Sequence, residues 1–276
     1  MRVDRQREAA DLLLAAYATG RPTTPIIEQF PEATIEDAYE IQRFTVEQWM
    51  RRGLVVKGHK VGLASTAMQR QVGVNQPDYG HLTSDMFHPE HLPIPVGTFI
   101  QPRIEPEVAF VLGRPLRGPG VTVADVVRAV DFVLPSLEVV DSRIRDWKIS
   151  IVDTIADNAS SGGVILGSRS ARVHDLDLRM LGCTLHVNGE LVETGGGGAV
   201  LGSPLNSVAW LANTVGQLGV TLEPGHVILP GSMTRAVAVR PGDTVVATMS
   251  GLGTVTAVFA GATAEATAEA TEGTPR

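Results

Sequence analysis

The chain has 276 residues, of which 43% are hydrophobic and 19% are charged, and its formal net charge is −7. These values are typical of a globular protein that is long enough to bury a sizeable core. The lack of a basic excess argues against nucleic acid or an anionic membrane as a partner. Cys183 is the single cysteine, which excludes an intrachain disulfide, and no apolar run is long enough to span a bilayer. We therefore expect a cytoplasmic protein.

The first 54 residues are predicted to be helical and to pack on the core that follows. Residues 4–18 carry apolar side chains at helical spacing, and a Gly-Arg-Pro sequence ends this pattern. Thr34 and Asp37 are spaced as a capping box, with aspartate at the position that glutamate usually takes. This box predicts a second amphipathic helix that ends near Gly53.

Residues 55–260 are predicted to form one core that is rich in β-strands. Asn188 and Gly189 give the strongest hairpin signal in the chain, and only 122–129 and 204–218 have a helical pattern. Many strands with few helices predict an α+β fold built on a strongly bent sheet or roll. The expected strands are 55–63, 108–112, 132–140, 163–166, 181–187, 227–229, 244–249 and 254–259.

Two further segments are of low complexity. Residues 261–276 contain no core-forming side chain, which predicts a disordered or weakly helical tail. Residues 195–198 are four consecutive glycines, but they lack the GK[ST] ending of a P-loop and the GxGxxG spacing of a dinucleotide fold. We expect a flexible loop there, not a phosphate site.

Three carboxylates stand out because they lie within apolar, strand-like segments. Glu105 and Glu107 are two residues apart, so they share one face of a strand, and Glu138 lies in the next such segment. Burying like charges is unfavourable unless a positive charge compensates them. A hard divalent cation such as Mg²⁺ or Mn²⁺ would do so. The alternative is a buried ion network in which Arg103 and Arg143 pair with these acids.

Candidate acids and bases lie elsewhere in the chain. Lys60 lies in an apolar, glycine-flanked strand, where it could act as acid or base or extend its ammonium group to water. Asp78 lies in an expected turn, where it would ordinarily bond its own backbone. The polar residues of segment 153–161 allow two interpretations. They could form hydrogen bonds to a carboxylated substrate, or they could form the end of a helix and its loop. The members of this polar cluster are Asp153, Asp157, Asn158, Ser160 and Ser161.

Several motifs, in family order over about residues 5 to 260, carry a resemblance to a known family. They are HKVGL at 59–63, GVNQPDYG at 73–80, QPRIEPE at 101–107, LEVVDSRIRDW at 137–147, DTIADNAS at 153–160, and GSPLN with WLA at 202–206 and 210–212. With these motifs the chain resembles the 2-keto-4-pentenoate hydratases (2-hydroxypenta-2,4-dienoate hydratases). These are sister to the 4-oxalocrotonate decarboxylases within the fumarylacetoacetate-hydrolase-like fold.

The resemblance implies a mixed β roll or sandwich with N-terminal helices, bound Mg²⁺ or Mn²⁺, and a homo-oligomer. A complex with a sister decarboxylase or a downstream aldolase is a further expectation. The implied activity is addition of water to a 2-hydroxy-2,4-dienoate. This small substrate, the enol form of a 2-oxo acid, arises from meta-cleavage of aromatic or steroid rings. By position, the resemblance implies metal binding by Glu105, Glu107 and Glu138, acid/base roles for Lys60 and Asp78, and substrate binding by Ser160.

Three alternatives stay open at this point. A decarboxylase would start from a dicarboxylate, although Trp147 and the Gly231-Ser232 pair favour the hydratase branch. A hydrolase of carbon–carbon bonds shares the fold, but the sequence offers no convincing His–Glu pair to activate water. A stabilising partner subunit without activity is the third alternative, against which the retained candidate residues argue.

Overall fold

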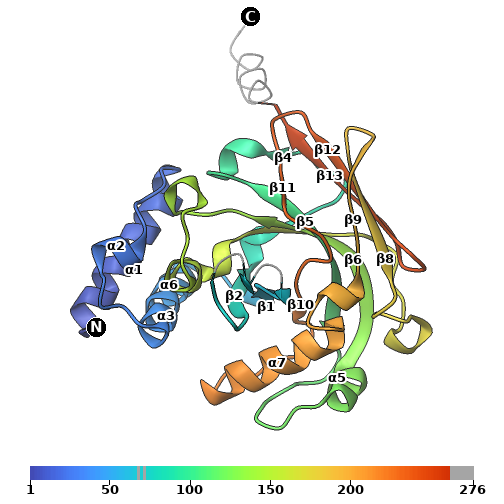
Figure 1. Ribbon diagram of the computed structural model, residues 1–276, viewed down its shortest axis with the longest axis horizontal. Coiled ribbons are helices and arrows are strands. Elements are labelled where there is room, and N and C mark those ends of the chain that lie inside the picture. Colours follow the sequence, from blue (N-terminus) through green and yellow to red (C-terminus); the bar gives the residue numbers. More distant parts are fainter. Residues whose placement is uncertain (67–68, 71–72, 262–276) are drawn as a thin grey trace, which may run out of the picture.

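The larger of two β-sheets runs through the centre of the molecule (Figure 1). The structure is a computed structural model that describes residues 1–66, 69–70 and 73–261. Among these residues the larger sheet has eight strands, in the order β2 (Asp78–Thr83), β1 (Val56–Gly62), β10 (Val227–Leu229), β5 (Arg103–Leu112), β6 (Val130–Val140), β7 (Ser161–Leu166) and β3 (Phe87–His88), with β11 (Val237–Ala238) paired to β5.

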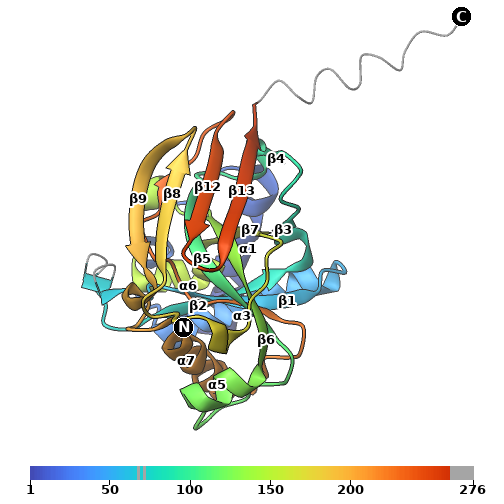
Figure 2. The ribbon, with the colours of Figure 1, turned by 90° about the vertical axis from the view of Figure 1, so that its right-hand side faces the viewer.

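The smaller sheet covers one side of the larger one, and Figure 2 shows its long strands side by side. In the described part of the chain its order is β4 (Ile94–Pro95), β13 (Gly253–Ala260), β12 (Thr244–Met249), β8 (Gly182–Val187) and β9 (Glu190–Gly196). The main hydrophobic core contains buried side chains of both sheets, among them Phe110, Leu137, Leu185 and Phe259. The expected α+β architecture is confirmed.

Helices lie at two places around the sheets. Ala9, Leu13 and Ile41 of the N-terminal helices share a small hydrophobic core with Ile155. Figure 1 shows these N-terminal helices grouped with α6 on one side of the molecule, apart from α5 and α7. The bounds of the helices in both groups are α1 Val3–Thr19, α2 Ile26–Gln29, α3 Ile35–Arg51, α5 Val123–Ala129, α6 Ile151–Ala156 and α7 Pro204–Gln217.

A buried glutamine on α3 connects the helical group to the larger sheet. The Gln42 side chain is 1% exposed. Its amide nitrogen donates to the carbonyl of Tyr79 on β2 at 2.8 Å and to the carbonyl of Ile155 on α6 at 2.9 Å. One side chain therefore fixes the spacing between α3, β2 and α6.

Local sequence signals located most elements to within a few residues. Thr34 and Asp37 form the expected capping box at the start of α3. Asn188 and Gly189 have φ values of 53° and 86°, as a two-residue hairpin turn of the primed type requires, and they join β8 to β9. Strand β2 and the short elements α2, α6, β3, β4 and β11 were not predicted.

The prediction of a flexible loop at the glycine run is wrong. Gly195 is paired within β9, and the following 3-10 turn begins at Gly197. A Cβ atom at Gly195 would lie 2.0 Å from the carbonyl oxygen of Met233, and one at Gly197 would lie 1.8 Å from that of Leu178. The glycines therefore allow close backbone approach in a packed part of the sheet.

Two sequence-based expectations concern the ends of the chain and its division. The predicted tail 261–276 lies outside the described residues except for Gly261. The proposed division at 54/55 falls between α3 and β1 and stays a prediction. Within the described ranges, every helix is too short or too polar to cross a membrane.

Candidate metal centre and active site

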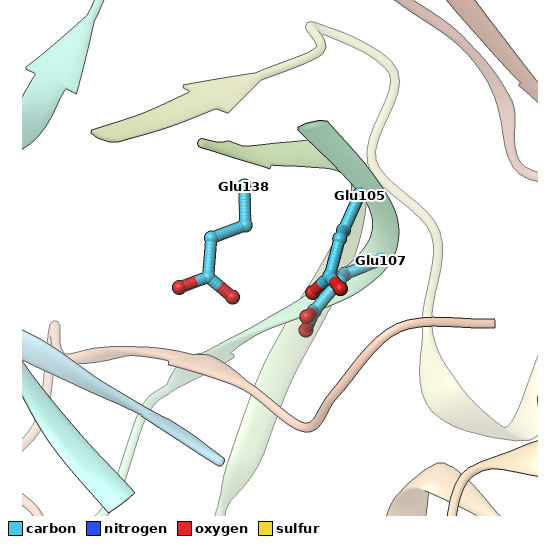
Figure 3. A group of neighbouring side chains, drawn as sticks. All are labelled: Glu105, Glu107 and Glu138. Carbon is cyan, nitrogen blue, oxygen red and sulfur yellow. The ribbon is translucent and has the colours of Figure 1, made fainter. Parts of the chain in front are cut away.

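Three glutamates from two neighbouring strands meet at one point (Figure 3). Glu105 and Glu107 lie on the same face of β5, and Glu105 is directly opposite Glu138 on the antiparallel strand β6. One carboxylate oxygen from each residue lies within 4.8 Å of the other two. The period of the strand and the register of the ladder bring the three carboxylates together, as the sequence predicted.

The carboxylate oxygens are short of partners, which fits a cation. Glu107 and Glu138 are both 0% exposed. Glu107 Oε2 accepts a 2.8 Å hydrogen bond from the backbone N–H of Gly231, but Glu107 Oε1 and Glu138 Oε2 have no hydrogen-bond partner among the described residues. Buried polar atoms are normally satisfied. An all-oxygen donor set of this kind suits Mg²⁺, Mn²⁺ or Ca²⁺.

The alternative of an arginine network does not hold. The Arg143 guanidinium lies 2.6 Å from Asp157 Oδ1 and 3.7 Å from Asp141 Oδ2, so other acids satisfy it. Arg103 forms no ion pair with a glutamate among the described residues, and its guanidinium stacks on Trp147 instead. Lys60 is therefore the one cation that forms an ion pair with the cluster among the described residues, and the charge of Arg103 acts on Glu105 without such contact.

Burial and mutual repulsion raise the pKa values of the glutamates. Burial, and then the charge of Glu138, raises the pKa of Glu105 to about 7. The same two causes raise the pKa of Glu107 well above its ordinary value. Burial also raises the pKa of Glu138, although the nearby Lys60 opposes this effect. A cation would have to displace protons from this group.

Lys60 reaches the cluster from β1. Its Nζ lies 3.2 Å from Glu138 Oε1, and the residue is 3% exposed, so the alternative of an ammonium group in water is excluded. Burial by itself lowers the pKa of Lys60, but the attraction of Glu138 and then of Asp78 outweighs it, so the pKa is raised. Lys60 is protonated at neutral pH in this environment.

Asp78 begins strand β2 next to Lys60, so the prediction that it caps a turn is wrong. Thr154 Oγ1 donates a 2.9 Å hydrogen bond to Asp78 Oδ2, whereas Oδ1 has no partner among the described residues. A Cβ atom at Gly62 would lie 2.2 Å from Asp78 Oδ1 and 3.5 Å from Lys60 Nζ. Burial raises the pKa of Asp78, and Lys60 and Thr154 partly offset this.

A short left-handed turn brings Ser160 to the same region. Asn158, Ala159 and Ser160 have φ values of 54°, 51° and 52°. The Asn158 side chain donates to the carbonyl of His81 at 2.8 Å and accepts from its N–H at 2.7 Å, which fixes the turn to β2. Such strain in residues other than glycine is sustained by the surrounding structure and concentrates at functional sites.

Most of the polar cluster is structural, which agrees with the interpretation of this segment as a helix end with its loop. Asp153 completes a capping box with Ser150 at the start of α6, and Asp157 binds Arg143. Ser160 is the member of the cluster that lines the cavity described next. The Ser150–Asp153 box is the signal by which α6 could have been found in the sequence.

A cavity of about 310 Å³ joins these residues. Its polar lining includes Lys60, Asp78, Glu105 and Ser160, which the sequence analysis had named, and Thr154, which it had not. The apolar lining consists of Leu63, Val140, Trp147, Ile149, Ala159 and Ala236. The lining of the cavity therefore combines carboxylates, an ammonium group and hydroxyls with apolar side chains.

The family model described as "Fumarylacetoacetate (FAA) hydrolase C-terminal" matches residues 57–260, and the chain belongs to this family. It is 44% identical over 259 residues to a 2-keto-4-pentenoate hydratase of Paraburkholderia xenovorans, covering 94% of this chain and 96% of the relative. It is 45% identical over 236 residues to a 2-oxo-hept-4-ene-1,7-dioate hydratase of Escherichia coli, covering 83% and 88%.

A solved structure is similar over nearly the whole chain. The 4-oxalocrotonate decarboxylase from Pseudomonas putida G7, complexed with magnesium and adipate, superposes with a TM-score of 0.91 at 39% identity. The match covers 94% of this chain and 98% of the decarboxylase. Both branches named in the sequence analysis are thus represented among the relatives.

Proposed function

We propose that the protein is a metal-dependent hydratase that converts a 2-hydroxy-2,4-dienoate to a 4-hydroxy-2-oxo acid, in catabolism of aromatic or steroid ring-cleavage products. The observation that carries this proposal is a cluster of three glutamates beside Lys60, one of which, Glu105, lines a cavity together with Lys60 and Asp78. Relatives named as hydratases at 44% and 45% identity support the same reaction. We also propose a homo-oligomer, with a sister decarboxylase or an aldolase as a candidate partner.

The metal would be held by Glu105, Glu107 and Glu138. A divalent cation there, Mg²⁺ or Mn²⁺, would supply positive charge beside the substrate carboxylate and the 2-oxygen, where negative charge develops as the dienol becomes a ketone. The cross-strand pair of Glu105 and Glu138 fixes the spacing of two of these ligands before a cation arrives.

Lys60 and Asp78 form an acid and base pair on opposite strands. The protonated Lys60 Nζ is suited to donate a proton to carbon, and the unpartnered Asp78 Oδ1 is suited to accept one from a hydroxyl group or from water. Ketonisation moves one proton from the 2-hydroxyl to carbon, and hydration moves one from water to carbon. The same pair therefore serves both steps, and exchange with water resets it.

Ser160 completes the proposed site. Ser160 lines the cavity together with Lys60 and Asp78 and is 3% exposed. Among the residues that the structure describes, its hydroxyl makes a single hydrogen bond, a long one of 3.4 Å to Asp157 Oδ2, so it is available to a ligand. We assign it to the substrate carboxylate.

The experiment that tests this proposal measures turnover of freshly generated 2-hydroxypenta-2,4-dienoate in the presence of Mg²⁺, Mn²⁺ or EDTA. The loss of dienol absorbance is the readout. Metal-dependent formation of 4-hydroxy-2-oxopentanoate is the expected result. The decarboxylase is the second candidate because of the 0.91 TM-score to such an enzyme. Release of carbon dioxide from 2-hydroxymuconate, with no hydration, would establish it. Inactivity on both substrates would favour the partner subunit without activity.

A further inference from the structure

A second cavity, of about 320 Å³, lies next to the proposed active site. Val140 and Ser160 line the active-site cavity, whereas the residues that follow them in the sequence, Asp141 and Ser161, line the second one. Among the described residues, the two cavities have no lining residue in common. The second cavity is therefore a separate space that borders on the same two segments of the chain.

Aromatic rings of the two long N-terminal helices line this cavity. Tyr17 of α1 and Trp49 of α3 meet edge to face, with ring centres 4.9 Å apart. Further apolar residues of the lining are Leu14, Leu54, Met86 and Phe99. Because aromatic rings attract one another beyond the effect of the area that they bury, such a lining suits an aromatic ligand.

Buried hydrogen-bond donors in the same cavity lack partners. Arg143 is 1% exposed, and three of its five N–H groups donate, two to Asp157 and one to the carbonyl of Ser161. Asp141 Oδ2 lies 3.7 Å from the guanidinium, which is beyond hydrogen-bond distance. The Tyr17 hydroxyl is buried and has no partner in the described part of the chain. Buried donors are normally satisfied, so these groups indicate an acceptor inside the cavity.

The charges around these donors disfavour an anion as the acceptor. The charge of Arg143 is already balanced by Asp157 Oδ1 at 2.6 Å. The lining contains two further carboxylates, those of Asp85 and Asp141. Arg52 also lines the cavity, but it is exposed, so water and salt screen its charge. An uncharged acceptor is therefore favoured.

We propose that the second cavity binds an uncharged molecule with an aromatic ring and a hydroxyl group, in the simplest case a phenol. The ring would lie among the side chains of Tyr17, Trp49 and Phe99, and the oxygen would accept from Arg143 and Tyr17. The carboxylate of Asp85 offers an acceptor to the hydroxyl proton, which a ketone could not use.

Asp157 connects this cavity to the proposed active site. Its carboxylate accepts from Arg143 Nε at 2.6 Å and from the Ser160 hydroxyl at 3.4 Å. A ligand bound to Arg143 therefore acts on the group that holds Ser160, and occupancy of the two cavities is linked. This linkage rests on the proposed function, in which Ser160 binds the substrate carboxylate, whereas binding to the second cavity does not.

Titration calorimetry with phenol, toluene and benzoate tests the binding. The three probes share one ring and differ in its substituent. We expect phenol to bind at least about tenfold tighter than toluene, which forms no hydrogen bond, and than benzoate, which is charged. Absence of phenol binding would show that the cavity holds only water, and tighter binding of benzoate would show an anion site. Either result would overturn the proposal.

Variants of α1 locate the bound phenol. Tyr17→Phe keeps the ring and should lose most of the preference for phenol over toluene. Ala18→Phe adds a ring at an exposed position that lines the cavity and should abolish phenol binding. Ala15→Phe adds the same ring at an exposed position of α1 outside the lining and is the matched control. Unchanged phenol binding in Ala18→Phe would place the ligand elsewhere and overturn the proposal.

Steady-state kinetics at saturating phenol test the linkage. The KM for 2-hydroxypenta-2,4-dienoate should change by about fivefold in the wild type and stay constant in Ala18→Phe. A constant KM in the wild type would refute the linkage. Calorimetric binding of phenol by a protein that turns over no dienoate would support the second cavity and refute the hydratase.

Discussion

Asp78, the proposed base, is held in position by two neighbours of different kinds. Gly62 leaves the space that Asp78 Oδ1 occupies, because a Cβ atom there would lie 2.2 Å away. Thr154 binds the other oxygen at 2.9 Å and so orients the carboxylate. Neither residue is itself an acid or base, and both are required for the geometry of one.

Thr154→Val should lower kcat on the order of tenfold, because the loss of a hydrogen bond to a charged group costs about 1.5–3 kcal/mol. The hydroxyl also lowers the pKa of Asp78, so its loss should move the acid limb of the pH–rate profile upward. Thr154→Ser keeps the hydroxyl and should restore both properties. If the two variants had the same kcat and the same pH–rate profile, the hydroxyl of Thr154 would have no role and the residue would act by packing alone.

Glu107→Gln should weaken Mn²⁺ binding at least about tenfold, because an amide carries no charge to balance the cation. Titration calorimetry measures this directly. Glu190→Gln removes the same charge from an exposed position on β9 and is the matched control. Unchanged affinity and full activity in Glu107→Gln would refute the proposed metal site.

The sequence predicted the glutamates of the site better than their surroundings. Strand periodicity alone puts Glu105 and Glu107 on one face, and the structure confirms this. No local pattern says which hydroxyl of a polar segment faces inward, so Thr154 was missed. Asp78 was misread because its neighbours have turn chemistry, whereas pairing with a distant strand decides its conformation.

At the scale of elements, the positions of helices and strands follow local chemistry, and close approaches between elements do not. The capping box at Thr34 begins α3 as expected, and the predicted helix at 122–129 begins with a second such box at Thr122, which was not predicted. The 195–198 glycines have no such local explanation. They are needed because carbonyl groups of other segments pass within 2.0 Å of where two of their Cβ atoms would be, which only the tertiary structure reveals.

Gly197→Ala should destabilise the protein by about 2 kcal/mol, because its Cβ atom would lie 1.8 Å from the backbone oxygen of Leu178. Gly198→Ala is the matched control, since its Cβ atom would lie 3.4 Å from the carbonyl oxygen of Arg179. Urea unfolding should separate the two variants. Equal midpoints would contradict the close packing of this turn.

At the scale of the whole molecule, the carboxylate cluster links stability to pH and metal. Without metal, the pKa of Glu105 is about 7 in the folded state, above its ordinary value of 4.5. A carboxyl group with a raised pKa in the folded state contributes stability that is present below about 4.5 and is lost as the pH rises through about 7. Bound metal would remove this loss.

The rise in Tm caused by Mg²⁺ should therefore increase between about pH 5.5 and pH 8, and the Kd should fall roughly tenfold per pH unit for each proton released. Thermal unfolding with MgCl₂ or EDTA across this range measures the difference, in which other titrating groups cancel. A difference that does not change with pH would show that the glutamates are already ionised in the metal-free protein.

Gln42 has a consequence for where the working enzyme begins. Its two hydrogen bonds lead to the carbonyls of Tyr79 and Ile155, each adjacent in sequence to one member of the Asp78–Thr154 pair. The stretch 57–260 matched by the family model contains every proposed site residue but not Gln42. A protein truncated to that stretch would retain the full set of chemical groups and lose the brace that sets the distance between two of them, so homology alone would misplace its functional boundary.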